Sequence, residues 1–286
     1  MDAQQATKEL ERLQTEMMTI QAKYMADPTP ENIAKMQQEL TALSMKMAEI
    51  TSQAVGGAMQ DLNMDDIDFS LDDEDLKQFI KDNPVAPGKE KYMPIGALLI
   101  ATHYEPWQTL ALMGDMEYWS QVLSEGWGIT DAKEGKKMLA SLLEGRHYAK
   151  FGEEFRKALA GKPHKLDDES VESYNATMET INEYMPGFLP TAKKCDNIIA
   201  WDLDRVGYLA RIFHAMGWLS EAETYEWLDK TGKRIKTEFK TWDEYIASIV
   251  IGRAVAFSFD EVVVETAKEI VEDEKEYLKK YPLSSL

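Results

Sequence analysis

The sequence contains one cysteine and four histidines among its 286 residues. A single cysteine, Cys195, cannot form an intramolecular disulfide, and it excludes a metal cluster held by several cysteines. The histidines His103, His147, His164 and His214 are scattered, and none belongs to a His-Glu-x-x-His pair. We therefore predict neither a metal site nor a bound cofactor.

Long apolar runs and phosphate-binding loops are also missing. No run approaches the ~20 apolar residues that a membrane-spanning helix needs, and the polar start at Met1-Asp2 does not resemble a signal peptide. Neither Gly-x-Gly-x-x-Gly nor Gly-x-Ser-x-Gly occurs, so the nucleotide-binding fingerprint and the nucleophile elbow are both absent. We expect a cytoplasmic protein, and we predict no catalytic residue.

Basic residues are scarce relative to acidic ones. The chain has 32 lysines and arginines against 51 aspartates and glutamates, which gives a net charge of −19. A field of this sign repels nucleic acid and anionic lipid surfaces, so neither is an expected partner. A basic protein partner would be attracted. The apolar fraction of 44% is large enough for a substantial core.

The N-terminal part of the sequence predicts two helices. Apolar residues recur there every three or four positions, and Asp27-Pro28-Thr29-Pro30 separates the two periodic stretches. Facing apolar seams predict an antiparallel helical hairpin over residues 1–60. Two helices alone bury little surface, so we expect the hairpin to dock on the rest of the chain, a second copy or a partner. A homo-oligomer through residues 1–60 is one of these alternatives.

The remainder divides into an acidic stretch and a larger apolar region. Residues 61–92 are rich in carboxylates and contain prolines, which predicts a linker with a short helix near residues 71–80. Helical spacing dominates afterwards and alternating strand patterns are absent, so we predict a multi-helix, all-α globular domain over residues 93–286. The short apolar run at residues 95–102 fits either a buried helix or a strand.

Capping patterns predict where three of the C-terminal helices begin. Ser220 with Glu223 and Thr241 with Glu244 have the spacing of capping boxes. Asp260 is positioned to begin a last amphipathic helix.

Polar residues interrupt the apolar stripes of two predicted helices, at residues 198–216 and 242–257. The set consists of Trp201, Asp202, Arg205, Arg211, His214 and Arg253. Arg253 lies on an apolar face, and a buried guanidinium without a partner costs several kcal/mol. We therefore predict that Asp202 pairs with Arg253.

Two interpretations of this polar set remain open. In the first, it is a structural network that fixes the register of the helices, with Trp201 stacking on Arg205. In the second, Arg205 and Arg253 bind an anionic ligand or a partner's carboxylate, and Asp202 orients them. The two differ in whether the side chains are accessible.

Several short motifs in the C-terminal half together resemble one protein family. They are Trp201-Asp202-Leu203-x-Arg205, Gly217-Trp218-Leu219-Ser220, Trp242-Asp243-Glu244-Tyr245 and Ile251-Gly252-Arg253-Ala254, with Gly126-Trp127-Gly128-Ile129-Thr130 upstream. The combination resembles the bacterial domain-of-unknown-function family DUF1266 over roughly residues 107–257. This resemblance implies a helical unit, a bacterial origin and proximity to secreted-toxin and immunity genes, and it implies no activity.

Three functions are compatible with the sequence. The first, which we favour, is a non-enzymatic bacterial protein-interaction protein, for example an immunity or adaptor protein that binds a secreted effector. The second is an enzyme of unknown reaction with a pocket around Asp202, Arg205 and Arg253. The third is a structural protein that self-associates through the N-terminal hairpin.

Overall fold

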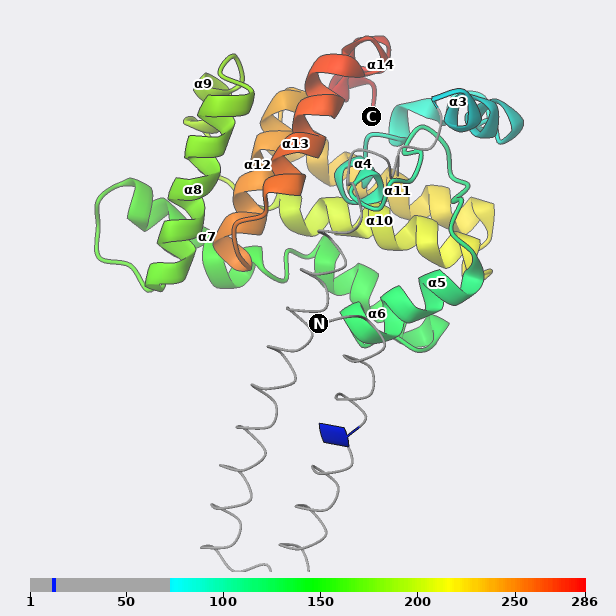
Figure 1. Ribbon diagram of the computed structural model, residues 1–286, viewed down its shortest axis with the longest axis horizontal. Coiled ribbons are helices and arrows are strands. Elements are labelled where there is room, and N and C mark those ends of the chain that lie inside the picture. Colours follow the sequence, from blue (N-terminus) through cyan, green and yellow to red (C-terminus); the bar gives the residue numbers. More distant parts are fainter. Residues whose placement is uncertain (1–11, 14–72) are drawn as a thin grey trace, which may run out of the picture. The chain divides into compact units, whose positions relative to one another are not determined.

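The computed structural model describes residues 12–13 and 73–286 (Figure 1). The chain divides into two compact units, Met1–Leu71 and Asp72–Leu286. The predicted hairpin over residues 1–60, and with it the predicted oligomer interface, lies outside the described residues except for positions 12–13. All described residues except 12–13 belong to the second unit.

The described part of this unit is helical and contains no strand, which confirms the predicted all-α class there. In chain order its α-helices are α3 (Asp73–Asp82), α4 (Ala97–Ala101), α5 (Met116–Gln121), α6 (Ala132–Leu143), α7 (Tyr148–Leu159), α8 (Asp168–Tyr184), α9 (Leu189–Ala192), α10 (Ala200–Ala215), α11 (Glu221–Glu238), α12 (Trp242–Ala256), α13 (Glu261–Lys268) and α14 (Lys275–Lys280). Short 3-10 turns, η2 (Glu90–Tyr92) and η5 (Leu283–Ser285), and π-helical turns, η3 (Val122–Gly126) and η4 (Glu269–Asp273), complete them. None of these helices is long and apolar enough to cross a membrane.

Helix α10 is the centre of the unit. Every residue from Ala200 to Phe213 is buried, and the helix packs against α4, α6, α11 and α12. Figure 1 shows α10 running between α12 and α6. A helix buried on all sides has no solvent face for polar residues, so every polar side chain on it must find a partner inside the protein.

The chain before α5 packs closely against α10. The apolar run at residues 95–102, which fitted either a helix or a strand, forms the short buried helix α4. Gly96 has a φ of 85°, and a Cβ on Gly207 would lie 2.4 Å from the Ile95 carbonyl oxygen. The two backbones therefore touch, and only glycine fits at this crossing.

Residues 73–92, at the end of the stretch expected to be a linker, belong to the second compact unit. They include the expected short helix, observed as α3, and the turn η2. Tyr92 is buried in the core, where its hydroxyl donates to Asp229 at 2.9 Å. The apolar contacts of Tyr92 are long-range, and the acidic local composition gives no sign of them.

The predicted helix starts differ in how their caps are made. Ser220 and Glu223 form the full capping box. Thr241 accepts from the Glu244 N–H, but the Glu244 carboxylate accepts from the Lys240 N–H instead of completing the box. Asp260 occupies the N-cap position of α13 without a capping bond. The expected single last helix is divided into α13, η4 and α14.

Candidate functional site

A buried ion pair lies in the N-terminal half of α10. Arg205 Nη2 is 2.6 Å from Asp202 Oδ1, and the two side chains are 3% and 1% exposed. Arg205 Nε also donates to the Trp201 carbonyl oxygen at 2.9 Å. The backbone N–H groups of His147 and Tyr148 both donate to Asp202 Oδ2 at 2.8 Å. Asp202 therefore caps the N-terminus of α7 from a distant helix, where a carboxylate also complements the helix dipole.

The ring of His147 completes the arrangement around Asp202. His147 Nδ1 lies 2.9 Å from Asp202 Oδ1 and 2.7 Å from Arg205 Nη2. One nitrogen cannot both donate to the carboxylate and accept from the guanidinium, so the tautomer of His147 decides whether Nδ1 donates to Asp202 or accepts from Arg205. Arg205 Nη1 makes no hydrogen bond with the described residues. Burial lowers the Arg205 pKa to about 10, opposed by Asp202, so the guanidinium stays charged at neutral pH.

The predicted pairing of Asp202 with Arg253 is wrong. Arg253 Nη1 donates to the Ser258 carbonyl oxygen at 2.8 Å, and Nη2 is 3.3 Å from Asp260 Oδ2. The Arg253 side chain is 21% exposed, so it is not sealed in the core. The reason is local: the turn after α12 brings Asp260 back to Arg253, which also explains why Asp260 does not cap α13.

A cavity of about 380 Å³ lies beside this ion pair. Three arginines line it: Arg205 from α10, Arg253 from α12 and Arg146 from the turn between α6 and α7. Its aromatic lining residues include Trp127, Trp201, Tyr208 and Phe257. We call this cavity the arginine–aromatic pocket. Its size falls within the range of small-molecule binding sites.

Aromatic rings hold the faces of two of these guanidinium groups. The Arg205 guanidinium carbon lies 4.4 Å from the Trp201 ring centroid, which confirms the predicted stacking, and 5.6 Å from that of Phe257. The Arg253 guanidinium carbon lies 5.4 Å from the Phe257 centroid and 5.9 Å from that of Trp201. Rings on the flat faces leave the N–H edges for hydrogen-bond acceptors.

The pocket has more positive than negative charge. Arg205 and Arg253 each have one carboxylate partner. Arg146 is exposed, its hydrogen bond goes to the Met138 sulfur at 3.2 Å, and its charge contributes to lowering the Arg205 pKa. A surplus cation in a protein of net charge −19 is suited to an anion.

Another part of the pocket lining is polar but uncharged. The two ring nitrogens of His103 are 2.8 Å from the Tyr118 hydroxyl (Nδ1) and 2.9 Å from the Tyr208 hydroxyl (Nε2). Burial lowers the pKa of His103 and raises that of Tyr208, so both are neutral at pH 7. The ring of Trp127 is close to both groups, 5.9 Å from the Tyr208 ring and 5.9 Å from the Arg205 guanidinium carbon.

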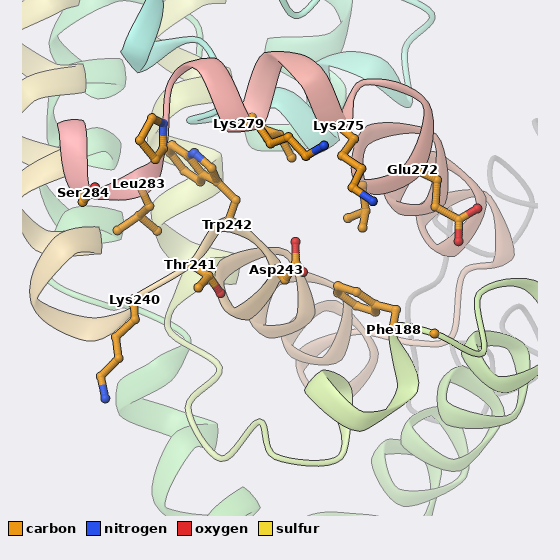
Figure 2. Close-up of a pocket in the computed structure, with 14 residues that line it drawn as sticks. Phe188, Lys240, Thr241, Trp242, Asp243, Glu272, Lys275, Lys279, Leu283 and Ser284 are labelled. Carbon is orange, nitrogen blue, oxygen red and sulfur yellow. The ribbon is translucent and has the colours of Figure 1, made fainter.

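A larger hollow, of about 650 Å³, lies between the N-terminus of α12 and α14 (Figure 2). Its three lysines, Lys240, Lys275 and Lys279, are exposed and spread around the hollow rather than converging on one point. Lys279 is already paired with Glu276 at 2.7 Å. Long exposed lysines are flexible, so this hollow is a weaker candidate than the arginine–aromatic pocket despite its greater volume.

A second set of buried charges on α10 faces away from the pocket. Arg211 donates to the carbonyl oxygens of Trp107 (2.8 Å) and Ile95 (3.0 Å) and to that of Met93. Asp204 accepts from the N–H of Gly96 at 2.8 Å. It also accepts from the N–H of Leu99 at 3.3 Å and the Tyr245 hydroxyl at 3.1 Å. These hydrogen bonds connect the segment around α4 to α10, so the role of the two side chains is structural.

The comparison with protein families gives a match over more than half of the chain. The profile of a family described as protein of unknown function (DUF1266) matches residues 122–282. The chain belongs to this family. The DUF1266 range begins later and ends further along the chain than the resemblance over residues 107–257 suggested. It contains Trp127, Arg205 and Arg253, whereas His103 lies before it.

A curated relative gives no activity either. The uncharacterized protein YbeR of Escherichia coli (strain K12) is 28% identical to the chain over 137 residues, which are 46% of this chain and 55% of YbeR. The chain thus spans about half the length of this relative. No solved structure matches the chain.

The structure separates the predicted site residues. Trp201, Arg205 and Arg253 line the pocket, and Asp202 lies behind Arg205. Arg211 belongs to the second charged set, and His214 lies at the end of α10, where Nδ1 is 3.3 Å from the Leu219 carbonyl oxygen.

Sequence reasoning missed several residues of the pocket and of the second charged set. Asp204 had a visible signal, a second carboxylate within a helix of buried pattern. Trp127 was named only as part of a family motif, and Tyr208 only lies within the predicted helix. Arg146 and His147 had no signal, because only the tertiary fold brings their segment to α10.

Proposed function

We propose that this protein binds, without transforming it, a small ligand that carries an anionic group on a flat apolar body. The observation that carries the proposal is Arg205. Its guanidinium is positioned by Asp202 and the Trp201 carbonyl, while Nη1 has no partner among the described residues. Arg146 and Arg253 add positive charge at the same cavity, and the aromatic side chains offer surfaces for the apolar body.

The hydrogen bonds that Asp202 already accepts favour binding over catalysis. An enzyme at this position would use Asp202 as a base or to activate a nucleophile. Both of its oxygens instead accept hydrogen bonds, Oδ2 from two backbone N–H groups and Oδ1 from the Arg205 side chain. A carboxylate held in this way orients its neighbours and has little capacity to accept a substrate proton.

Calorimetric titration with three probes tests the proposal. Benzoate has the charge and the flat ring, acetate has only the charge, and benzamide has only the ring. We expect benzoate to bind at least about tenfold more tightly than either of the others, because each lacks one half of the recognition. Equal affinity for benzoate and benzamide, or no binding of benzoate, would contradict the proposal.

Two arginine variants locate the binding. Arg146→Gln and Arg253→Met each remove one positive charge from the pocket and should weaken benzoate binding by about tenfold. Arg234→Gln is the matched control: it removes the same charge from the molecule, but Arg234 pairs with Glu238 on α11, outside the pocket. If all three variants weaken binding equally, benzoate responds to net charge rather than to the pocket.

The interaction function favoured from the sequence is a second candidate. Phe257, Phe259 and Val262 are 50%, 36% and 45% exposed around the turn from α12 to α13, beside the pocket. Exposed apolar side chains of this size are typical of surfaces that contact another protein. In this version the pocket receives an acidic side chain of the partner. The more specific immunity or adaptor role stays a prediction.

Affinity purification tests this candidate. Tagged wild-type protein and a double variant, Phe259→Ser with Val262→Ser, are compared in the native host. A partner that binds here is retained by the wild type and lost from the variant. Retention by both would place the interface elsewhere, and circular dichroism of the variant checks that it is folded.

A further inference from the structure

His147 has two neighbours in the arginine–aromatic pocket that a neutral ring cannot satisfy together. Its Nδ1 lies 2.9 Å from Asp202 Oδ1, a carboxylate oxygen that accepts hydrogen bonds, and 2.7 Å from Arg205 Nη2, which only donates them. If Nδ1 carries a proton, its N–H faces the guanidinium N–H. If Nδ1 carries none, its lone pair faces the carboxylate. Each tautomer of the neutral ring therefore leaves one unfavourable contact.

The imidazole lies among the guanidinium groups of the pocket. It lines the cavity together with Arg146, Arg205 and Arg253, and its side chain is 23% exposed, so protons from solvent reach it. Its ring centroid is 5.3 Å from that of Phe257, the ring that also contacts the guanidinium groups of Arg205 and Arg253. An anion bound by these arginines therefore lies close to the imidazole as well.

Positive charge around the imidazole opposes its protonation in the absence of an anion. The charged groups around it are two ion pairs and one further arginine: Arg205 with Asp202 on α10, Arg253 on α12 with Asp260 after it, and Arg146 in its own turn. Arg146 is exposed, and its hydrogen bond goes to a methionine sulfur. Its charge is therefore unbalanced, and a proton on His147 would add a second positive charge beside it. Asp202 favours that proton, but its charge is already shared with Arg205.

We propose that His147 takes up a proton from solvent when the pocket binds its anion. The bound negative charge cancels the positive surplus that opposes protonation, and it gives Arg205 an acceptor in place of Nδ1. The protonated ring then donates to Asp202 and adds a positive charge beside the anion. Histidine is suited to this role because its charge ordinarily changes between about pH 5 and pH 8. This inference rests on the proposed binding function and adds its coupling to pH.

The other histidine of the pocket is a poorer candidate for this proton. The two ring nitrogens of His103 face the hydroxyl groups of Tyr118 and Tyr208, so neither nitrogen faces a carboxylate. Burial lowers the pKa of His103, which keeps its ring neutral at pH 7. The uptake is therefore assigned to His147.

The coupling fixes the direction of the pH dependence. A proton that strengthens anion binding is itself bound more tightly when the anion is present, by the same factor. Benzoate should therefore bind about threefold to tenfold more tightly at about pH 6 than at about pH 8. At about pH 9 the ring is neutral with or without benzoate, so the uptake should vanish there.

Calorimetric titration of the full chain with benzoate, in two buffers of different ionisation enthalpy, counts the protons exchanged on binding. At about pH 7 the wild type should take up roughly 0.3 to 1 proton, and at about pH 9 almost none. His147→Gln should show almost no uptake at either pH, whatever its affinity for benzoate. His164→Gln is the matched control, because His164 is exposed between α7 and α8 and outside the pocket; it should keep the wild-type uptake.

A second measurement does not require the variant to bind benzoate. The chain has four histidines, so NMR can follow their imidazole protons, and the signal missing from His147→Gln identifies His147. In wild type this signal should titrate at higher pH with benzoate than without it.

Three results overturn the coupling and leave the proposed function standing. They are benzoate binding without proton uptake, uptake that persists in His147→Gln, and a titration of the His147 signal that benzoate does not change. Failure of benzoate itself to bind the wild type overturns the proposed function. The two failures are therefore distinguishable.

Discussion

Asp202 illustrates how one buried carboxylate can be shared among several elements. The sequence marks it as a charge inside an apolar helix, and burial demands partners for it. The partners are Arg205 on the same helix and the two N–H groups at the start of α7. A backbone N–H has no side-chain signature, so the sequence could predict the need for a partner but not these partners.

The two arginines of the pocket should differ in their effect on stability. Arg205→Met leaves Asp202 buried without its cation and should lower the free energy of unfolding by about 3 kcal/mol. Arg253→Met should cost only about 1 kcal/mol, because Asp260 is 33% exposed and water can replace the arginine. Urea denaturation of both variants measures the difference. Equal losses of unfolding free energy in the two variants would show that the burial of Asp202 does not make Arg205 more important for stability than Arg253.

Asp204 should make stability depend on pH. Burial raises its pKa from 3.8 to about 6, opposed by hydrogen bonds from Leu99 and Gly96. The folded protein then holds the proton more tightly than the unfolded chain does. The stabilisation is therefore complete below pH 3.8 and is lost as the pH rises through about 6.

Asp204→Asn removes this titration. Relative to the variant, wild type should lose roughly 2 kcal/mol of unfolding free energy between pH 4 and pH 7, measured by urea denaturation at both values. Asp229→Asn is a control of opposite sign, because a hydrogen bond from Lys233 lowers the Asp229 pKa. Stability curves of wild type and Asp204→Asn that stay parallel would contradict the assigned burial effect.

At the scale of elements, α10 and the segment around α4 are held together by backbone as much as by side chains. Because Gly207 has no side chain, the Ile95 carbonyl can approach the helix closely. Arg211 then donates a hydrogen bond to the same carbonyl oxygen. Sequence periodicity predicted an apolar stripe on this helix. It could not identify the neighbour, because residues 95–102 carry no periodic signal of their own.

Gly207→Ala tests this crossing. The added methyl group would lie 2.4 Å from the Ile95 oxygen and 2.7 Å from the Gly96 nitrogen, and backbone atoms cannot move aside cheaply. We expect a loss of about 2 kcal/mol or more in unfolding free energy. Gly187→Ala is the control, since its Cβ would meet nothing within 4 Å. Equal denaturation midpoints for the two variants would show that the crossing is looser than described.

For the whole molecule, helical spacing predicted the all-α class, and motif resemblance predicted the family. The pocket could not be predicted in the same way. Its lining comes from α4 and the turn after it, the end of η3, α6, the turn between α6 and α7, α10 and the end of α12, and the convergence of these segments depends on long-range packing. The net charge also gives the wrong sign for the charge at the pocket, because a molecule of charge −19 has three arginines around this one cavity.

The two-unit division predicts how the chain responds to truncation. Because Asp72–Leu286 is compact and has its own apolar core, a protein lacking residues 1–60 should still unfold cooperatively in calorimetry. If the predicted hairpin mediates self-association, the truncated protein should also fall to monomer mass in light scattering. Loss of the cooperative transition would contradict the division, and an unchanged mass would exclude assembly through residues 1–60.

The central claim is that the arginine–aromatic pocket binds an aromatic anion, and a crystal structure with 4-bromobenzoate tests it most directly. The anomalous signal of bromine locates the ring, and the density locates the carboxylate. The account predicts the carboxylate on Arg205 Nη1 and the ring against Trp127, with Asp202 still holding Arg205. An empty pocket at saturating ligand, or bromine bound only at the lysines of Figure 2, would contradict it.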